Sequence, residues 1–267
     1  MKERSYSLID THTHLFDKVF IDDLPQVIER AKAIGVSHVF MPNIDSTTIK
    51  AMLSVCDMYK GYCSPMIGLH PTSVNENYES ELSLVAQYLA SANSFVAIGE
   101  IGIDLYWDKT YQKEQQIAFV RQVELALKYN LPIVIHCRKA FNLVYDTLKL
   151  YKSTTLSGIF HSFTGEREDI DKMLEFGNFF LGINGIVTFK KSSLPEVLPS
   201  IPIERIVLET DSPYLSPVPN RGKRNETANL KYVQAKVADI YHLSLEQVAE
   251  ITTKNALSLF GGRRRTL

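Results

Sequence analysis

Cysteine is scarce in this chain. Cys56, Cys63 and Cys137 are its only cysteines among 267 residues, and no two of them form a CxxC pair. Three thiols cannot all pair with one another, so the chain does not have the composition of a small domain held together by disulfides. We expect reduced thiols, as in a cytosolic protein.

Long apolar runs and an excess of one charge are also missing. The first apolar run begins at Leu8-Ile9 and is too short for the apolar core of a signal peptide, and no stretch approaches the roughly 20 apolar residues of a membrane helix. The net charge is −1, whereas proteins that coat long nucleic acids are strongly basic. We therefore expect a cytoplasmic protein with no membrane contact and no obligate protein partner, in which any contact with nucleic acid is local.

Short apolar, β-branched segments alternate with longer segments of helical periodicity along the whole chain. This alternation is typical of βα units around a parallel sheet. We expect eight strands, near residues 7–14, 37–44, 62–69, 95–102, 132–137, 157–163, 179–187 and 205–210. The expected helices lie near residues 22–34, 46–59, 79–92, 113–129, 140–151, 167–176, 192–198 and 225–240, with a last one near 244–260. The pattern predicts an α/β protein with a single-domain (β/α)₈ TIM barrel.

The domain organisation follows from the absence of any linker rich in Pro, Gly or Ser. We expect one barrel domain over residues 1–262 and a basic C-terminal tail over 263–267. An open Rossmann-like sheet is the main alternative, but no GxGxxG motif follows the first strand. Helix signals support the barrel, among them an apolar stripe at helical spacing made by Ile117, Val120, Val123 and Leu127.

Side chains of metal-ligand type stand at the ends of several predicted strands. The first strand ends in His12-Thr13-His14, and side chains two residues apart on a strand share a face. In a barrel, the carboxyl ends of all strands meet at one rim, where barrel active sites are built. Unpaired polar groups inside a core are costly, so a purely structural role for the whole set is not expected. We predict a metal centre made by His12, His14, Glu100, His136, His161 and Asp211.

Six ligands exceed the needs of one tetrahedral ion. A carboxylate such as Glu100 can bridge two cations, which lie about 3.5–4 Å apart in two-metal hydrolases. We therefore expect one ion on the HxH pair with Asp211 and Glu100, and a second ion on Glu100, His136 and His161. Imidazole and carboxylate ligands together suit Zn²⁺ or Mn²⁺, and Mg²⁺ where phosphate oxygens complete the coordination.

Longer motifs around these residues resemble those of a known family. They are IDTHTHL (9–15), GLHP (68–71), GEIGIDLYWD (99–108), Q-x₃-F with LPIVIHCRKA (115–140), GIFHSFTG (158–165), FLGINGIVTFK (180–190) and ETDSPYLSPVPNRGKRNE (209–226). Over nearly its whole length the chain is similar to the TatD family of metal-dependent deoxyribonucleases. One departure is Thr227, where relatives often have proline, at a position that affects a helix start and no ligand.

The resemblance implies a metal-dependent hydrolase of the amidohydrolase-like barrel superfamily that cleaves phosphodiester bonds, commonly as a 3′–5′ exonuclease on DNA and sometimes on RNA. It implies the same six metal residues, with Glu100 and Asp211 taking part in catalysis. It also adds His70, as a catalytic or phosphate-binding residue, and Glu209, which would help to activate water.

The expected mechanism is attack of a metal-activated water on phosphorus, with Asp211 steering or accepting its proton. Arg138, Arg221 and Lys223 are candidates to bind phosphates of the substrate, which we expect to be DNA ends or short oligonucleotides. Tyr106 and Trp107 are candidates to stack on a terminal base. Two alternatives remain open: hydrolysis of a C–N or ester bond by an amidohydrolase-type enzyme, and a non-catalytic, metal-stabilised protein that binds nucleic acid.

Overall fold

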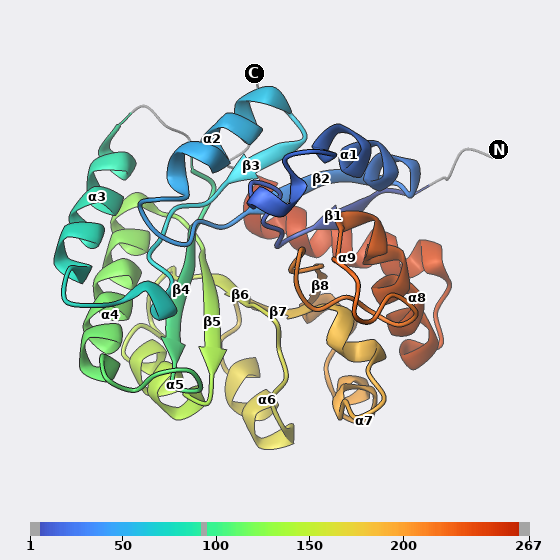
Figure 1. Ribbon diagram of the computed structural model, residues 1–267. Coiled ribbons are helices and arrows are strands. Elements are labelled where there is room, and N and C mark those ends of the chain that lie inside the picture. The colour runs from blue at the N-terminus through green and yellow to red at the C-terminus, as the bar shows by residue number, and fades with distance from the viewer. Residues whose placement is uncertain (1–5, 92–94, 262–267) are drawn as a thin grey trace.

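The computed structural model describes residues 6–91 and 95–261, so the tail predicted at 263–267 lies outside the described residues. Strands and helices alternate as predicted (Figure 1). The strands are β1 (Leu8–Asp10), β2 (Val36–Met41), β3 (Cys63–Pro65), β4 (Ile98–Asp104), β5 (Ile133–Arg138), β6 (Gly158–Phe160), β7 (Phe179–Ile183) and β8 (Ile206–Leu208). The α-helices are α1 (Leu24–Ala33), α2 (Ile49–Met58), α3 (Tyr78–Ala90), α4 (Gln112–Tyr129), α5 (Phe141–Lys149), α6 (Arg167–Leu174), α7 (Leu194–Val197), α8 (Leu230–Tyr241) and α9 (Leu245–Phe260).

The strands form a closed ring. All ladders are parallel, with β1, β2 and β3 in one run and β4 to β8 in another. Single bridges join the two runs on both sides, between Ile67 and Ile98 and between Thr13 and Ser212. Backbone hydrogen bonds add to these bridges, including Thr11 N–H to Leu208 O at 3.0 Å. The predicted TIM-barrel architecture is confirmed, and none of the described helices is both long and apolar enough to cross a membrane.

Several strands are shorter than predicted, because the chain turns out of the ladder where the site begins. The strand predicted over 157–163 ends at Phe160, and Ser162, two residues later, has a left-handed backbone with φ of 50°. Asp211 likewise has φ of 56°, after β8 has ended at Leu208. The helix predicted over 192–198 is cut to one α-helical turn, α7, which passes into a 3-10 turn over Leu198–Ser200; Pro199 within that turn has no N–H to continue the helix.

The interior of the barrel is filled by one apolar layer and closed by the last helix. Every strand, or the residues beside it, contributes to this layer, and α9 adds Ala256, Leu259 and Phe260. Val134 of β5 and Ile159 of β6 belong to it. His136 and His161 lie two residues further along those strands, and therefore on the same inward face. Position along the strand thus separates the apolar layer from the polar site above it.

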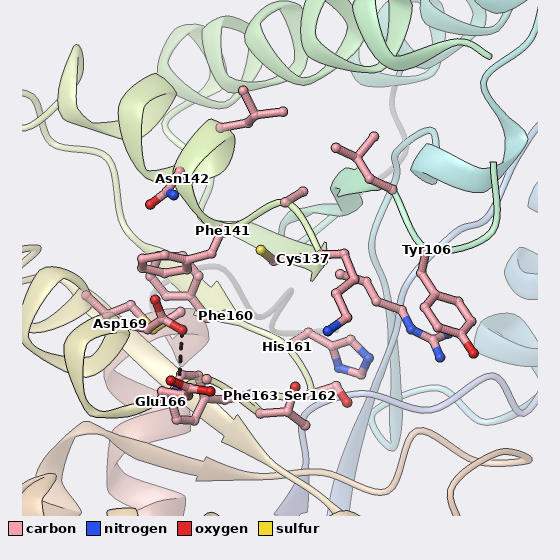
Figure 2. Close-up of a pocket in the computed structure, with 18 residues that line it drawn as sticks. Tyr106, Cys137, Phe141, Asn142, Phe160, His161, Ser162, Phe163, Glu166 and Asp169 are labelled. Atoms are coloured by element: carbon pink, nitrogen blue, oxygen red, sulfur yellow. Dashed lines mark hydrogen bonds between the residues drawn. The ribbon is translucent and has the colours of Figure 1, made fainter. Parts of the chain in front are cut away.

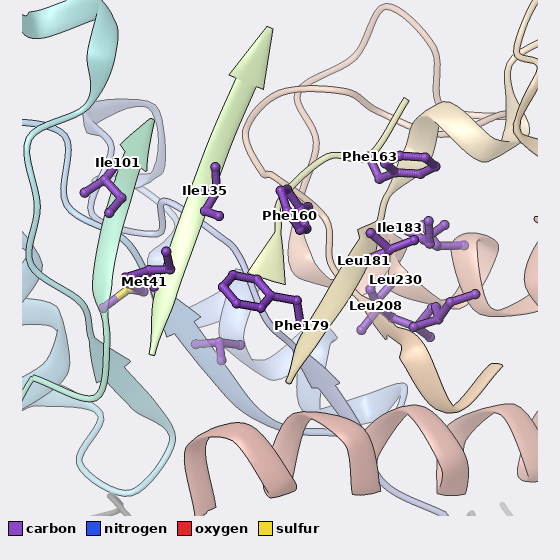
Figure 3. Close-up of a cluster of buried hydrophobic side chains, with 14 of the residues drawn as sticks. Met41, Ile101, Ile135, Phe160, Phe163, Phe179, Leu181, Ile183, Leu208 and Leu230 are labelled. Atoms are coloured by element: carbon purple, nitrogen blue, oxygen red, sulfur yellow. The ribbon is translucent and has the colours of Figure 1, made fainter. Parts of the chain in front are cut away.

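A second, larger set of apolar side chains packs the strands against the surrounding helices. Figure 3 shows part of it, with Ile101, Ile135 and Phe160 on neighbouring strands and Leu230 contributed by α8. These residues alternate along each strand with those of the interior layer, as the period of two requires. Both faces of the sheet are therefore buried, as is usual for parallel sheets.

The buried face of α4 differs from the predicted apolar stripe. Of the four predicted residues, Val123 is fully buried, whereas Ile117, Val120 and Leu127 are only partly so. The buried face of α4 combines apolar residues with two glutamines, Gln115 and Gln122. Gln122 Oε1 accepts the backbone N–H of Leu69 at 2.7 Å, and its amide donates to the carbonyl of the same residue at 3.3 Å. The helix that the stripe predicted is present as α4, with Val123 and Leu127 packed in the core, and the glutamines are buried because they accept backbone N–H groups of Leu69 and Asp104.

Replacing Gln122 by leucine is expected to destabilise the protein by about 1–3 kcal/mol, because the buried N–H and C=O of Leu69 lose their partners while the volume is kept. Denaturant unfolding of both proteins measures the difference. Gln116→Leu, on a partly exposed position of the same helix, is the matched control and should change stability little. A loss no larger than the control's would mean that the glutamine does not hold the loop.

Candidate metal centre

All six predicted metal residues gather at the carboxyl ends of the strands. His12 and His14 follow β1, Glu100 lies in β4 and His136 in β5, while His161 follows β6 and Asp211 follows β8. Glu100 and three of the histidines are buried, and the Asp211 side chain is 13% exposed. The rim of the barrel therefore brings together side chains that are up to 199 residues apart in the sequence.

The HxH pair and Asp211 form one tight group. His12 Nε2 lies 3.3 Å from His14 Nε2, and Asp211 Oδ1 lies 3.7 Å from the first nitrogen and 3.5 Å from the second. Asp10, the last residue of β1, holds the backbone beside this group in place. Its carboxylate accepts the N–H groups of His12 and Thr210, at 3.3 and 2.9 Å, and so fastens the end of β1 to the end of β8.

Glu100 lies between the two halves of the cluster. One of its oxygens, Oε2, is 3.1 Å from His12 Nε2, and the other, Oε1, is 2.8 Å from His136 Nδ1. Burial raises the pKa of Glu100, but the neighbouring His70, His12 and His161 outweigh it and hold that pKa well below its ordinary value. The buried carboxylate is therefore charged at neutral pH and offers one oxygen to each side.

The prediction grouped His161 with His136, but in the structure His161 lies beside His12, and His70 lies beside His136. The ring of His161 stacks on that of His12, with centroids 3.4 Å apart, so it stands beside the HxH pair. His70 takes the place near Glu100 and His136, with Nε2 3.4 Å from Glu100 Oε1 and 3.2 Å from His136 Nδ1. Three groups of ligand atoms result: His12 with Glu100 and His161, His12 with His14 and Asp211, and His70 with Glu100 and His136.

The hydrogen bonds of His70 fix which of its nitrogens carries the proton. Its Nδ1 accepts the backbone N–H of Thr72 at 3.1 Å, so the neutral ring is protonated at Nε2. Burial lowers the pKa of His70, which favours that neutral form. The Nε2–H therefore donates, either to Glu100 or to an anionic group in the cavity, which agrees with the phosphate-binding role implied by the resemblance.

The chemistry of the cluster fits divalent cations. Imidazole nitrogens and carboxylate oxygens converge within 4.8 Å of one another in each group. Mixed nitrogen and oxygen ligands of this kind are those of Zn²⁺ and Mn²⁺ sites. Ligands on both sides of Glu100 are what two neighbouring ions would need.

Two buried carboxylates stand behind the histidines and orient them. Glu209 Oε1 lies 3.0 Å from His161 Nδ1 and accepts the N–H of Ser162 at 2.7 Å. Asp104 Oδ2 lies 2.8 Å from His136 Nε2, which leaves His136 Nδ1 facing Glu100. Glu209 is fully buried and does not line the cavity, so it can influence a bound substrate only through its contact with His161. Its predicted role in activating water stays a prediction.

Asp104 was missed by sequence reasoning although a signal existed. It lies four residues after Glu100 on the same strand, and the period of two places both on one face. Its Oδ1 also accepts the N–H of Tyr106 at 2.8 Å, so one carboxylate holds both a histidine of the site and the loop that follows β4. Within that loop Tyr106 is 52% and Trp107 70% exposed.

The two oriented histidines carry raised pKa values. Burial lowers the pKa of His161, but Glu209, Glu100 and Asp211 outweigh it and raise that pKa to about 10. Burial is likewise outweighed at His136, where the contacts to Asp104 and Glu100 raise the pKa to about 9. In the metal-free protein both rings therefore act as internal cations for the carboxylates.

The cavity above this cluster has a volume of about 590 Å³. Arg138 lines it, with its guanidinium 3.8 Å above the ring of Tyr106. Arg221 and Lys223 do not line it: Arg221 stacks on Phe189 at 3.7 Å and donates to the carbonyl of Ser216. Of the predicted phosphate-binding cations, Arg138 alone is placed at the cavity, and roles for the other two stay predictions.

Comparison with known proteins identifies a family that matches nearly the whole chain. Residues 9–261 match the family described as TatD related DNase. The chain belongs to this TatD family. It is 39% identical over 254 residues to the uncharacterized metal-dependent hydrolase YabD of Bacillus subtilis, covering 95% of this chain and 98% of the relative.

Two further TatD relatives bear on the activity and the fold. The protein named 3′-5′ ssDNA/RNA exonuclease TatD of Pantoea ananatis is 31% identical over 260 residues, covering 95% of this chain and 99% of the relative. The crystal structure of YJJV, a TatD homolog from Escherichia coli K12, superposes with a TM-score of 0.89 at 25% identity, covering 95% of this chain and 98% of that one. The chain is thus a metal-dependent hydrolase of the TatD family.

The Asp104 carboxylate, which contacts His136, is expected to strengthen metal binding. Asp104→Asn keeps the shape but removes the charge that fixes the ring's tautomer, and loss of such an outer partner typically costs 10–100-fold in metal affinity. Competition with a fluorescent chelator measures the affinity for Mn²⁺ or Zn²⁺. Asp108→Asn, in the exposed part of the same loop, is the control, and equal affinities for the two variants would contradict the role given to Asp104.

Metal binding is expected to release protons at neutral pH. A histidine binds a metal only without its proton on the binding nitrogen, and the pKa values of His136 and His161, about 9 and about 10, keep both rings protonated at pH 7. Affinity for Mn²⁺ should therefore rise as the pH increases from about 6 to about 9. Calorimetric titration in two buffers of different ionisation enthalpy counts the protons released. An affinity independent of pH, with no proton released, would show that neither ring is a ligand.

Proposed function

We propose that this TatD-family hydrolase cleaves phosphodiester bonds at the ends of DNA or short oligonucleotides, RNA included, as a 3′–5′ exonuclease that uses two divalent ions. The observation that carries the proposal is the position of Glu100, a charged, buried carboxylate with one oxygen directed to each half of the ligand cluster. Two adjacent cations are a common means of stabilising both the attacking and the leaving oxygen of a phosphodiester.

In this proposal each ion has its own set of ligands. His12, His14 and Asp211 would hold the first, with His161 beside them, and Glu100 with His136 would hold the second. Mg²⁺, Mn²⁺ and Zn²⁺ all suit this set, Mg²⁺ provided that substrate oxygens complete its coordination. When bound, such ions neutralise phosphate charge and lower the pKa of water.

The protein's own groups then orient the reactants. Asp211 Oδ1 faces the nitrogens of His12, His14 and His161, at 3.5 to 3.8 Å. Its other oxygen, Oδ2, is the atom that accepts the proton of the attacking water. On the opposite side, the Nε2–H of His70 donates to a non-bridging phosphate oxygen, as its tautomer allows.

The side chains that line the cavity favour an anionic substrate. Arg138 lines the cavity and is held in place by its stacking on Tyr106, and a guanidinium is well suited to bind phosphate. Trp107 also lines the cavity with most of its side chain exposed, as expected for an aromatic surface on which a base can stack. The names of some TatD relatives, given as 3′-5′ ssDNA/RNA exonucleases, point the same way.

Hydrolysis of an amide or lactone is the competing proposal, since the same metal ligands can activate water toward a carbonyl. A neutral substrate of that kind would bring no anionic group to the guanidinium of Arg138 at the cavity. A screen of end-labelled single-stranded DNA, double-stranded DNA and RNA beside a panel of amides and lactones, each with Mg²⁺, Mn²⁺ and Zn²⁺, separates the two. Turnover of a carbonyl substrate alone would overturn the phosphodiesterase proposal.

Glu100→Gln is expected to lower phosphodiesterase turnover by at least about 100-fold, because it removes charge from the one carboxylate that both ions share. Turnover on oligonucleotides and metal content are measured together, with circular dichroism to confirm the fold. Glu124→Gln, an exposed change on α4, should leave all three unaltered. Full activity of folded Glu100→Gln with two ions bound would be incompatible with a catalytic centre built around that carboxylate.

A further inference from the structure

A second cavity, of about 540 Å³, adjoins the one that holds the metal residues. It lies between the segment that joins β5 to α5 and the segment that joins β6 to α6 (Figure 2). The two cavities have part of their walls in common, namely Cys137, Arg138, His161, Ser162 and Thr164. A molecule bound at His161 can therefore extend into either cavity without leaving the protein surface.

Charge is distributed unevenly along the second cavity. Arg138 and Lys139 are exposed near the common wall. Glu166 and Asp169 lie at the other end, and Figure 2 shows them on the side of the cavity away from His161 and Tyr106. An anionic group is therefore favoured near the common wall, and groups that donate hydrogen bonds are favoured at the acidic end.

The wall between these ends is apolar. Phe141, Phe163 and Met173 line it, and Asn142 adds an amide at the first turn of α5. Apolar ring surfaces combined with a few polar groups are typical of sites that bind flat heteroaromatic molecules. A nucleotide matches all three features, with its phosphate at Arg138 and Lys139, its base along the rings, and an exocyclic amino group toward the carboxylates.

Arg138 is fixed at the boundary of the two cavities. Its guanidinium lies 3.8 Å from the Tyr106 ring centre and 5.2 Å from that of Trp107. Held in this way, it can bind a phosphate that has one nucleoside on each side. Each cavity exceeds 500 Å³ and falls in the range of sites for small ligands, about 300–1,000 Å³, so each has room for one nucleoside.

We infer that the second cavity binds the nucleoside on one side of the scissile phosphodiester, with the other nucleoside in the metal cavity. The unit that the enzyme recognises is then a dinucleotide step rather than one terminal nucleotide. This inference rests on the proposed function, because it takes the bond cleaved at the common wall to be a phosphodiester.

Binding of two probes tests the inference without turnover. The first is deoxyadenosine monophosphate, and the second is a deoxyadenosine dinucleotide in which the bridging oxygen at the scissile position is replaced by methylene, which prevents hydrolysis. Calorimetry gives the affinity of each probe in Mg²⁺, Mn²⁺ and Zn²⁺. The dinucleotide should bind about tenfold or more tightly than the mononucleotide, since it gains a second stacked base.

Two variants alter the second cavity in different ways. Asn142→Trp fills it from α5, and Phe141→Ala removes a ring along which the base would lie. Both should reduce the advantage of the dinucleotide to about twofold while the mononucleotide, which still has the metal cavity, keeps its affinity within about twofold. Leu150→Ala, an exposed apolar truncation just after α5, is the control and should keep the full advantage. Thermal melting checks folding, and Phe141→Ala alone serves if Asn142→Trp is unstable.

The outcomes distinguish a failure of this inference from a failure of the proposed phosphodiesterase function. Equal affinity of the two probes for the unmodified protein, or an advantage that survives both variants, would overturn the inference and leave the phosphodiesterase proposal standing. If neither probe binds with any of the three cations, the proposed nucleotide substrate is itself wrong.

Discussion

The charged carboxylate of Glu100, buried among histidines, is the interaction on which the site depends. A buried carboxylate is stable only if charges or hydrogen-bond donors surround it, and here His12, His70 and His136 all lie within 3.4 Å of its oxygens. Each of these rings comes from a different strand end, so satisfying one charge requires the barrel to be closed. The same arrangement that makes the carboxylate tolerable in the metal-free protein leaves it ready to bind cations when protons leave the rings.

Much of the centre follows from the sequence because the strand period is simple. His136 and His161 each stand two residues beyond a residue of the interior layer, so alternation alone puts them on the inward face of the rim. The order of βα units then places His12, Glu100 and Asp211 at the same end. The assignment of residues to one rim therefore needs no knowledge of distances.

What the sequence does not reveal depends on contacts between distant segments. The side on which His161 stands is decided by its stacking on His12, 149 residues away in the chain. Arg224 follows Arg221 and Lys223 in one basic segment of the sequence, yet its guanidinium pairs with Asp23 at 2.7 Å and so ties this loop to the start of α1. Gln122 of α4 is buried for a similar reason, since its partners are the backbone groups of Leu69, 53 residues away. Polar residues whose partners are far apart in sequence carry no local pattern that reveals their burial.

The helix α9 has a consequence for how the protein is made. Its side chains Ala256, Leu259 and Phe260 complete the apolar layer inside the barrel, yet they are among the last described residues to be synthesised. Until α9 packs against them, the interior faces of the strands have no cover at that end, and exposed apolar strands are prone to aggregation. The layer that supports the histidine cluster from below is therefore completed by a segment that follows all eight strands in the sequence.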